Sequence, residues 1–204
     1  MKLIWHGHAC FQLQSAEGNI VFDPYERNYL SGLELPDISA DAVICSHRHG
    51  DHSAAELINL SGLKCGAKIT QIPCFHDEVC GAKRGANLIS IAELEGRRIV
   101  HMGDIGHMLN EEQVKALQNT DILLIPVGGV YTVDAKGAAE ICRAVKPRVI
   151  VPMHYRGEEK GLRNVAPVDD FLSMFPAEKI IKLAGNVLDA DEAQDGSVTV
   201  FNWP

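Results

Sequence analysis

The chain has 204 residues, of which 46% are hydrophobic and 23% charged, as in ordinary soluble globular proteins. Its formal net charge of −8 argues against a broad nucleic-acid-binding surface, and no apolar run approaches the roughly 20 residues that cross a membrane. The length fits a single domain over residues 1–204, and the absence of a signal-peptide pattern, with six cysteines that form no C-x-x-C pair, favours a cytoplasmic protein.

The first 40 residues predict three strands and a long loop. Strands are expected over 2–5, 10–14 and 19–23, the last two as a hairpin that ends at Asp23-Pro24. Residues 24–40 have no clear period, and a loop of this length in a compact domain is often functional. It forms either one wall of a substrate pocket or an ordinary surface loop whose aromatic side chains pack against the protein.

A short apolar strand over 42–45 leads into the most informative stretch of the chain. Ser53 followed by Glu56 has the pattern of a capping box, which predicts a helix over 54–60. Neutral imidazole and carboxylate are ligands for a divalent metal such as zinc. Alternate residues of an extended segment point the same way and adjacent ones diverge, so we expect two ions rather than one. The connection between strand and helix holds four such groups in seven residues: His47, His49, Asp51 and His52.

The remainder of the chain mixes hairpins with strand–helix alternation. Two sheets with helices on their outer faces would accommodate both patterns. Apolar strands lead into His47, Asp104 and His154, and sites in α/β sheets commonly form at such strand ends. The expected elements are strands over 68–72, 88–94, 97–102, 121–127, 148–152, 180–183 and 197–201, and helices over 110–118, 134–145 and 168–175.

The segment from His47 to His52 reads H-x-H-x-D-H, and the chain thereby resembles the metallo-β-lactamase superfamily. Over nearly its whole length it is similar to the compact branch that includes the ascorbate-6-phosphate lactonases. The resemblance implies an α/β fold of the metallo-β-lactamase type, a four-layered αβ/βα sandwich. It also implies three further ligands: His76 with His47 and His49 on the first ion, His154 with Asp51 and His52 on the second, and Asp104 as a bridge between them.

The expected cofactors are two divalent metal ions. Flavodiiron oxygen reductases of the same superfamily carry Glu where this chain has His49, and an imidazole there favours zinc over a redox di-iron centre. Manganese remains an alternative, because geometry and availability decide occupancy.

Six further residues are candidates for supporting the ligands or binding substrate. His8 resembles a histidine near the metal cavity in the lactonase-like branch, although it could equally be an ordinary hydrogen-bonded histidine of a strand. Asp23, in the Asp23-Pro24 pair after the early hairpin, resembles a carboxylate that supports the ligands in the family. Metal ligands need hydrogen-bonding neighbours, and His101 and His107 bracket Asp104 in the sequence. Guanidinium suits bidentate capture of phosphate or carboxylate, which favours Arg84 and Arg156 as anion-binding residues unless acidic side chains pair with them.

These features predict a metal-dependent hydrolase. A metal-bound hydroxide, held by Asp51 as the catalytic residue, would attack a small, anionic ester, lactone or phosphoester. The alternatives are a phosphodiesterase or nuclease of the same fold, a thiolester hydrolase, and a non-catalytic metal-binding protein. The expected partner is a small-molecule substrate, with no membrane involved, and self-association as a homo-oligomer stays open.

Overall fold

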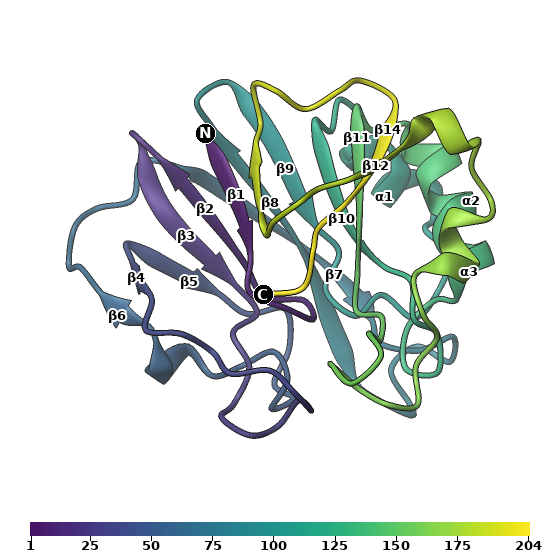
Figure 1. The fold of residues 1–204 in the computed structure, drawn as a ribbon, viewed down its shortest axis with the longest axis horizontal. Coiled ribbons are helices and arrows are strands. Elements are labelled where there is room, and N and C mark those ends of the chain that lie inside the picture. The colour runs from purple at the N-terminus through teal and green to yellow at the C-terminus, as the bar shows by residue number, and fades with distance from the viewer.

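The computed structural model describes residues 1–204 and contains two facing β-sheets (Figure 1). The five-stranded sheet has the order β13-β1-β2-β3-β5. The hairpin predicted near the N-terminus forms its centre, where Phe11 pairs with Phe22 and Ser15 with Gly18. Its strands are β1 (Lys2–Trp5), β2 (Phe11–Ser15), β3 (Gly18–Phe22), β5 (Ala42–Ile44) and β13 (Val187–Asp189).

The seven-stranded sheet has the order β12-β14-β11-β10-β9-β8-β7. Every residue of β10 is buried, as its continuous apolar run predicts for a strand covered on both faces. The strands of this sheet are β7 (Lys68–Phe75), β8 (Ala86–Leu94), β9 (Arg97–His101), β10 (Ile122–Pro126), β11 (Val149–Met153), β12 (Ile180–Lys182) and β14 (Ser197–Val200).

Helices lie outside the seven-stranded sheet (Figure 1). They are α1 (Glu111–Ala116), α2 (Ala135–Val145) and α3 (Asp169–Leu172). Asn110 closes the predicted capping box of α1 with Gln113, and Asp134 accepts from the backbone N–H of Gly137 at the start of α2. α2 buries one stripe, including Ala138, Ile141, Cys142 and Val145, which is why it packs against the sheet.

The outer face of the five-stranded sheet is covered by the segment between β3 and β7. Tyr25, Leu30, Leu33 and Ile38 of this segment are buried and pack with Val21 in a small second core. Within it are the 3₁₀ turn η1 (Ala55–Leu57) and a short parallel pair, β4 (Ser39–Ala40) and β6 (Asn59–Leu60). The layering of helices, two sheets and an outer covering confirms the α/β sandwich of metallo-β-lactamase type.

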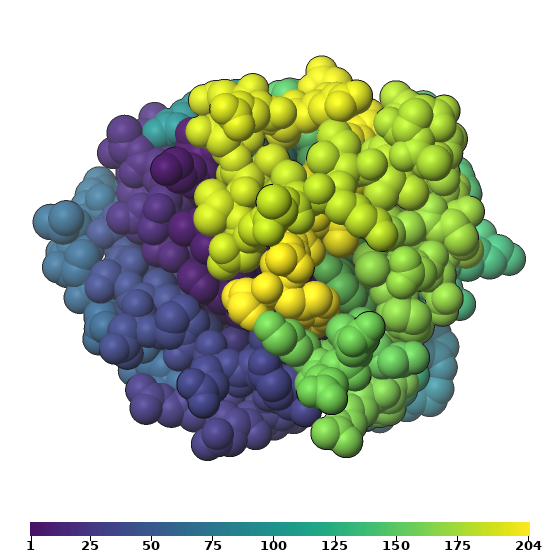
Figure 2. Space-filling model, in the orientation of Figure 1, coloured from purple at the N-terminus to yellow at the C-terminus, as the bar shows by residue number.

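The main core fills the space between the sheets, and a group of aromatic rings joins them. The Trp5 ring centroid in β1 lies 5.6 Å from that of Tyr155 and 4.5 Å from that of Trp203. Such pairs contribute about 0.5–1.5 kcal/mol each beyond their burial. The C-terminal segment crosses the same seam, because β13 pairs with β1 and β14 pairs with β11. Figure 2 shows this segment in yellow between the two halves of the molecule.

Two expected helices are much shorter in the structure, and one strand of the five-stranded sheet was not expected. The helix expected over 54–60 is only the turn η1, and Ser53 makes no cap because its hydroxyl donates to the carbonyl oxygen of His49. The residues after the turn instead pair with β4. The helix expected over 168–175 is reduced to α3, and the short strand β13 had no sequence signal. None of the helices has the length and apolarity needed to cross a lipid bilayer.

Candidate metal centre

Strands from both sheets deliver the candidate metal-binding side chains to one edge of the molecule. β7, β9, β10 and β11 run in the same direction, because β8 pairs antiparallel with β7 and β9 while β9, β10 and β11 pair in parallel. Their carboxyl ends therefore meet at one edge, where His76, Asp104 and His154 follow β7, β9 and β11. The loop after β5 brings the other four predicted ligands there: His47, His49, Asp51 and His52.

A first group of donors consists of His47, His49 and His76, with one ring nitrogen from each lying within 4.8 Å of the others. Nδ1 of His76 donates to the carbonyl oxygen of Tyr131 at 3.0 Å, which leaves Nε2 as the ligand atom. Nε2 of His47 is buried without a hydrogen-bond partner. Burial lowers the pKa of His47 to about 3, so the imidazole is neutral at pH 7, the form that binds metal.

The second group consists of Asp51, His52 and His154 together with His8, and again the four donor atoms lie within 4.8 Å of one another. Asp104 lies between the two groups. Its Oδ2 is 3.2 Å from Nε2 of His76 in the first group and 3.1 Å from Nε2 of His154 in the second. Its Oδ1 is 3.3 Å from Nε2 of His52. A single carboxylate therefore touches donors of both groups, as a bridging ligand must.

The donor atoms fit divalent metal ions in spacing and in chemistry. Ligands about 2.0–2.2 Å from one tetrahedral zinc ion lie roughly 3.3–3.6 Å apart, close to the 3.1–3.3 Å between Asp104 and its imidazole neighbours. Nε2 of His52, Nε2 of His154 and Oδ1 of Asp104 are buried and have no hydrogen-bond partner. Buried polar atoms without partners are costly, so a cation on which these lone pairs converge accounts for the arrangement.

The charges of the group are strongly coupled. Burial opposes the charged form of His52, but Asp104 and Asp23 more than offset it and raise the pKa of His52 well above its ordinary value. Burial likewise opposes ionisation of Asp104, and the neighbouring His154 and His52 lower the pKa of that carboxyl well below its usual range. Metal ions bind the deprotonated imidazole and carboxylate, so metal binding to this group should depend on pH.

Asp23 lies behind the candidate ligands and orients His52. Its Oδ2 accepts from Nδ1 of His52 at 2.7 Å and from Oγ of Ser46 at 2.6 Å, and its Oδ1 accepts from the backbone N–H of Ser46 at 2.7 Å. The carboxylate thereby fixes the ring of His52 and the start of the ligand loop together. Asp23 has φ 45°, a left-handed conformation that Asp tolerates better than most residues.

The turn that presents Asp104 depends on its neighbours. Gly103 has φ 54°, and a Cβ there would lie 2.3 Å from Oδ1 of Asn87, so only glycine fits. The N–H of Asp104 donates to that same Oδ1 at 2.9 Å. Nε2 of His101 donates to the carbonyl oxygen of Ala9 at 2.8 Å, and its Nδ1 accepts from the N–H of Gly103. His101 therefore supports the Asp104 turn, and Asn87 is a supporting residue that the sequence did not indicate.

The remaining two candidate histidines differ in their positions. His8 is fully buried, and its Nε2 donates to Oδ2 of Asp51 at 3.2 Å. It has φ 53°, and its carbonyl oxygen accepts from the N–H of His154, so it supports two residues of the second group. His107 instead accepts from the N–H of Phe75 and lies against the carbonyl oxygen of Met108. Its ring nitrogens are engaged by the backbone, and neither contacts Asp104.

A cavity of about 300 Å³ opens over the two donor groups. This is at the lower end of the range for small-molecule sites. The aromatic and apolar residues that line it come from segments distant in sequence. Of these segments, the sequence indicated only the 24–40 loop, which supplies Tyr29, as a possible wall of the cavity. Tyr131 and Leu162 were missed, because nothing near them in the sequence marks a site. The lining residues are Tyr29, His49, Asp51, His76, Arg84, Asp104, Tyr131 and Leu162.

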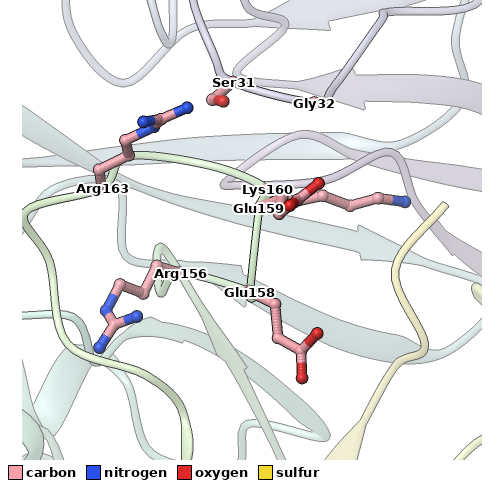
Figure 3. Close-up of a pocket in the computed structure, with 8 residues that line it drawn as sticks. Ser31, Gly32, Arg156, Glu158, Glu159, Lys160 and Arg163 are labelled. Atoms are coloured by element: carbon pink, nitrogen blue, oxygen red, sulfur yellow. The ribbon is translucent and has the colours of Figure 1, made fainter.

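The two candidate arginines lie in different places. Arg84 lines the cavity that contains the candidate metal ligands His49, Asp51, His76 and Asp104. Arg156 lines a neighbouring cavity of about 770 Å³ that contains none of them. Figure 3 shows Arg156 and Arg163 on one loop of that second cavity, with Ser31 opposite. The two acidic residues Glu158 and Glu159 line the same space.

Comparison with known proteins finds relatives along most of the chain. Residues 2–154 match the family described as the beta-lactamase superfamily domain. A UPF0173 metal-dependent hydrolase of Thermoplasma acidophilum is 27% identical, over 76% of this chain and 83% of its own. The structure is similar to that of a candidate Zn-dependent hydrolase of the metallo-beta-lactamase superfamily from Thermotoga maritima, with 33% identity, a TM-score of 0.79 and coverage of 98% of this chain and 97% of that one.

A more distant structure has the same fold. The metallo hydrolase Igni18 from Ignicoccus hospitalis is 20% identical, has a TM-score of 0.68, and covers 100% of this chain and 95% of its own. At this identity the similarity extends to the fold alone.

Proposed function

This chain is a metal-dependent hydrolase of the β-lactamase superfamily, and we propose that it uses two divalent ions, preferably zinc, to hydrolyse a small, anionic ester, lactone or phosphoester. The observation that carries the two-ion proposal is the position of Asp104, within 3.1–3.3 Å of ligand atoms from both groups. Five imidazoles and two carboxylates make up the proposed ligand set, which suits zinc, while manganese stays an alternative. The ligands are His47, His49, Asp51, His52, His76, Asp104 and His154.

When bound, such ions lower the pKa of water enough for it to attack near neutral pH, and they polarise the bond under attack. The protein's own residues supply the orientation. Asp51 lines the cavity and accepts a hydrogen bond from His8, which holds one carboxylate oxygen in place. His52 and His8 keep the pKa of Asp51 below its ordinary value although burial opposes this, so the carboxylate can accept a hydrogen bond from the attacking water. Asp51 is therefore the proposed catalytic residue.

Features of the site favour this function over the alternatives. The cavity is small and reaches the donor groups, as a catalytic site requires and a purely structural metal site does not. The net charge of −8 disfavours a nuclease that holds a long polyanion. We also propose a cytoplasmic location, supported by six cysteines that are all free thiols.

The test begins with metal content. Protein purified without chelator and reconstituted with zinc or manganese should hold two ions per chain by mass spectrometry, and His154→Ala should reduce this toward one. His107→Ala is the matched control, because His107 lies close to Asp104 in the sequence but its ring nitrogens are hydrogen-bonded to the backbone of Phe75 and Met108. Reconstituted protein is then screened on lactones, carboxylate esters and phosphoesters. At most one ion in the reconstituted wild type would contradict the dinuclear site.

A further inference from the structure

We infer that Arg84 is the residue that receives a carboxylate or phosphate group of the substrate, and that Asp77 positions it for this role. The inference rests on the proposed hydrolase function and adds to it a specific recognition element. Arg84 is the only Lys or Arg among the residues that line the 300 Å³ cavity. It shares that cavity with Asp51 and Asp104, the proposed catalytic residue and the proposed bridging ligand.

The guanidinium of Arg84 is held in place without an acidic partner. Nη2 donates to the carbonyl oxygen of Val130 at 2.9 Å, and Cζ lies 5.7 Å from the ring centroid of Tyr131. No carboxylate in the structure lies within ion-pair distance of Arg84, whereas Arg97 and Arg98 each have one and Arg148 has two. Arginine has five N–H donors, so most of them remain for a ligand. An anchored, unpaired guanidinium at a cavity wall is suited to bidentate capture of an anion.

The loop that carries Arg84 is fastened to a metal ligand by Asp77. The buried carboxylate of Asp77, next to His76, accepts four backbone N–H groups: those of Val79, Gly81, Lys83 and Arg84, at 2.8–3.0 Å. The N–H of His76 also donates to the carbonyl oxygen of Gly85 at 3.1 Å, which closes the loop at its other end. Arg84 thereby has a fixed position relative to His76, and such preorganisation lowers the entropy cost of binding.

The facing segment, Gly129 to Tyr131, fixes the same geometry from the other side. Val130 has φ 61°, a left-handed conformation that is unfavourable for a β-branched residue, and Gly129 before it has φ 64°. This strained turn presents two successive carbonyl oxygens, that of Val130 to Arg84 and that of Tyr131 to Nδ1 of His76. Strain of this kind persists where the surrounding structure over-determines it, and it concentrates at functional sites. One turn therefore sets the spacing between the arginine and the metal ligand.

The chemistry of the walls restricts the substrate further. Tyr29, Tyr131 and Leu162 provide the apolar surface of the cavity. The substrate class is thus a small molecule with an acidic group on one side of its scissile ester, lactone or phosphoester bond. Arg156 does not serve this role, because it faces the neighbouring cavity, which lacks metal ligands and contains Glu158 and Glu159 (Figure 3).

The binding test uses zinc-reconstituted protein with inorganic phosphate and acetate as separate probes, measured by isothermal titration calorimetry. Hydrogen bonds to charged groups contribute about 1.5–3 kcal/mol, so Arg84→Ala should raise the Kd of the preferred anion roughly tenfold or more. Arg84→Lys keeps the charge but loses the planar fork, and it should give an intermediate Kd. Arg143→Ala, on the exposed side of α2, is the charge-matched control, and Arg156→Ala tests the neighbouring cavity.

The kinetic test compares a neutral and an anionic p-nitrophenyl ester. Arg84→Ala should raise KM for the anionic ester more than for the neutral one, with a smaller effect on kcat, because remote anion binding is similar in ground and transition states. Suppose that the wild type turns over an ester, and that Arg84→Ala has the same anion Kd and the same KM as the control Arg143→Ala. That result would overturn the Arg84 inference and leave the hydrolase proposal intact. Anion binding that depends on Arg84, with no turnover of any ester, would support the Arg84 inference and contradict the hydrolase proposal. Metal content and thermal melts of each variant separate these outcomes from misfolding.

Discussion

The carboxylate of Asp23 lies 2.7 Å from Nδ1 of His52, and neither side chain reaches solvent. The pair joins the end of the N-terminal hairpin to the ligand loop after β5, because the same carboxylate also accepts the backbone N–H of Ser46. A proton on Nδ1 leaves the lone pair on Nε2 of His52, and that atom faces Asp104. Asp23, which is not itself a proposed ligand, thus selects which ring nitrogen of His52 is available to a metal ion.

Replacing Asp23 with Asn should weaken metal binding without unfolding the protein. Asn tolerates the left-handed backbone at this position, but its amide is a weaker acceptor for His52 and can donate where the carboxylate accepts. Loss of such a supporting group typically lowers metal affinity about 10–100-fold. Competition with a chromophoric chelator measures the affinity. Zinc affinity equal to that of the wild type, in a variant with an unchanged circular dichroism spectrum, would show that Asp23 is merely structural.

Removing the metal should lower thermal stability. An ion present at about 100 times its Kd stabilises the native state by about 2.7 kcal/mol, and each kcal/mol corresponds to about 2–4 °C in a domain of this size. We therefore expect chelator to lower Tm by roughly 5–11 °C for each ion lost. Added zinc should restore the original Tm. An unchanged melt in protein proven metal-free by mass spectrometry would indicate that these residues do not hold a resident ion.

Asp51→Ala should reduce kcat at least about 100-fold once a substrate is found, because this residue belongs to the second donor group and is the one we propose to orient the attacking water. Arg48→Ala, an exposed change in the same loop, serves as the control. Metal content must be measured in both variants. Turnover close to that of the wild type in a fully metallated Asp51→Ala protein would refute the proposed role.

The sequence predicts the proposed ligands better than it predicts the substrate cavity. His47, His49, Asp51 and His52 lie within one short loop, so their convergence depends only on local geometry. His154 and Asp104 follow strands that are recognisable from their apolar runs, and parallel strands bring their carboxyl ends together. The central strands and α2 could be predicted from the sequence equally well, because each has a strong periodicity or a helix cap of its own.

The substrate cavity depends on contacts between segments far apart in the chain. Tyr131 reaches His76 through a carbonyl oxygen that a strained turn directs, and no sequence pattern marks that turn. Arg156 is two residues from a proposed ligand yet faces another cavity, whereas Arg84 is further away and faces the site. Nearness in sequence therefore did not determine which arginine could meet a substrate. The helix cap predicted at Ser53 also does not form because of a contact within the ligand loop. The hydroxyl of Ser53 donates to the carbonyl oxygen of His49 instead of capping a helix.

The cysteines should differ sharply in reactivity. Cys80 is exposed, whereas burial raises the pKa of Cys74 to about 11 and that of Cys142 to about 12. The thiolate is the reactive form, so these buried thiols should react slowly at pH 8. A disulfide reagent should therefore modify Cys80 in a fast phase that Cys80→Ser removes, and all six thiols should react in guanidinium chloride. A fast phase that survives in Cys80→Ser would contradict this assignment.

Asp77→Asn should loosen the loop that carries Arg84. Each carboxylate oxygen of Asp77 accepts two backbone N–H groups, and an amide has only one oxygen, so two of the four would lose their acceptor in either orientation of the side chain. The variant should keep its metal content but bind phosphate more weakly, as Arg84→Ala does. A merely structural role for Asp77 would lower stability while leaving the phosphate Kd unchanged.

The same substitution should change how stability depends on pH. Burial opposes ionisation of Asp77, but the N–H groups of Arg84, Gly81, Val79 and Lys83 outweigh it and lower its pKa to about 2, below the ordinary value of about 3.9. A depressed carboxyl pKa contributes stability that is fully present above about pH 4 and is lost as the pH falls toward 2. The difference between the urea midpoints of wild type and Asp77→Asn should therefore be constant from pH 5 to about 7 and shrink below about pH 4. Because other titrating groups are common to both proteins, they cancel in this comparison, and a difference that stays constant down to pH 3 would mean that the ionised form of Asp77 does not hold the loop.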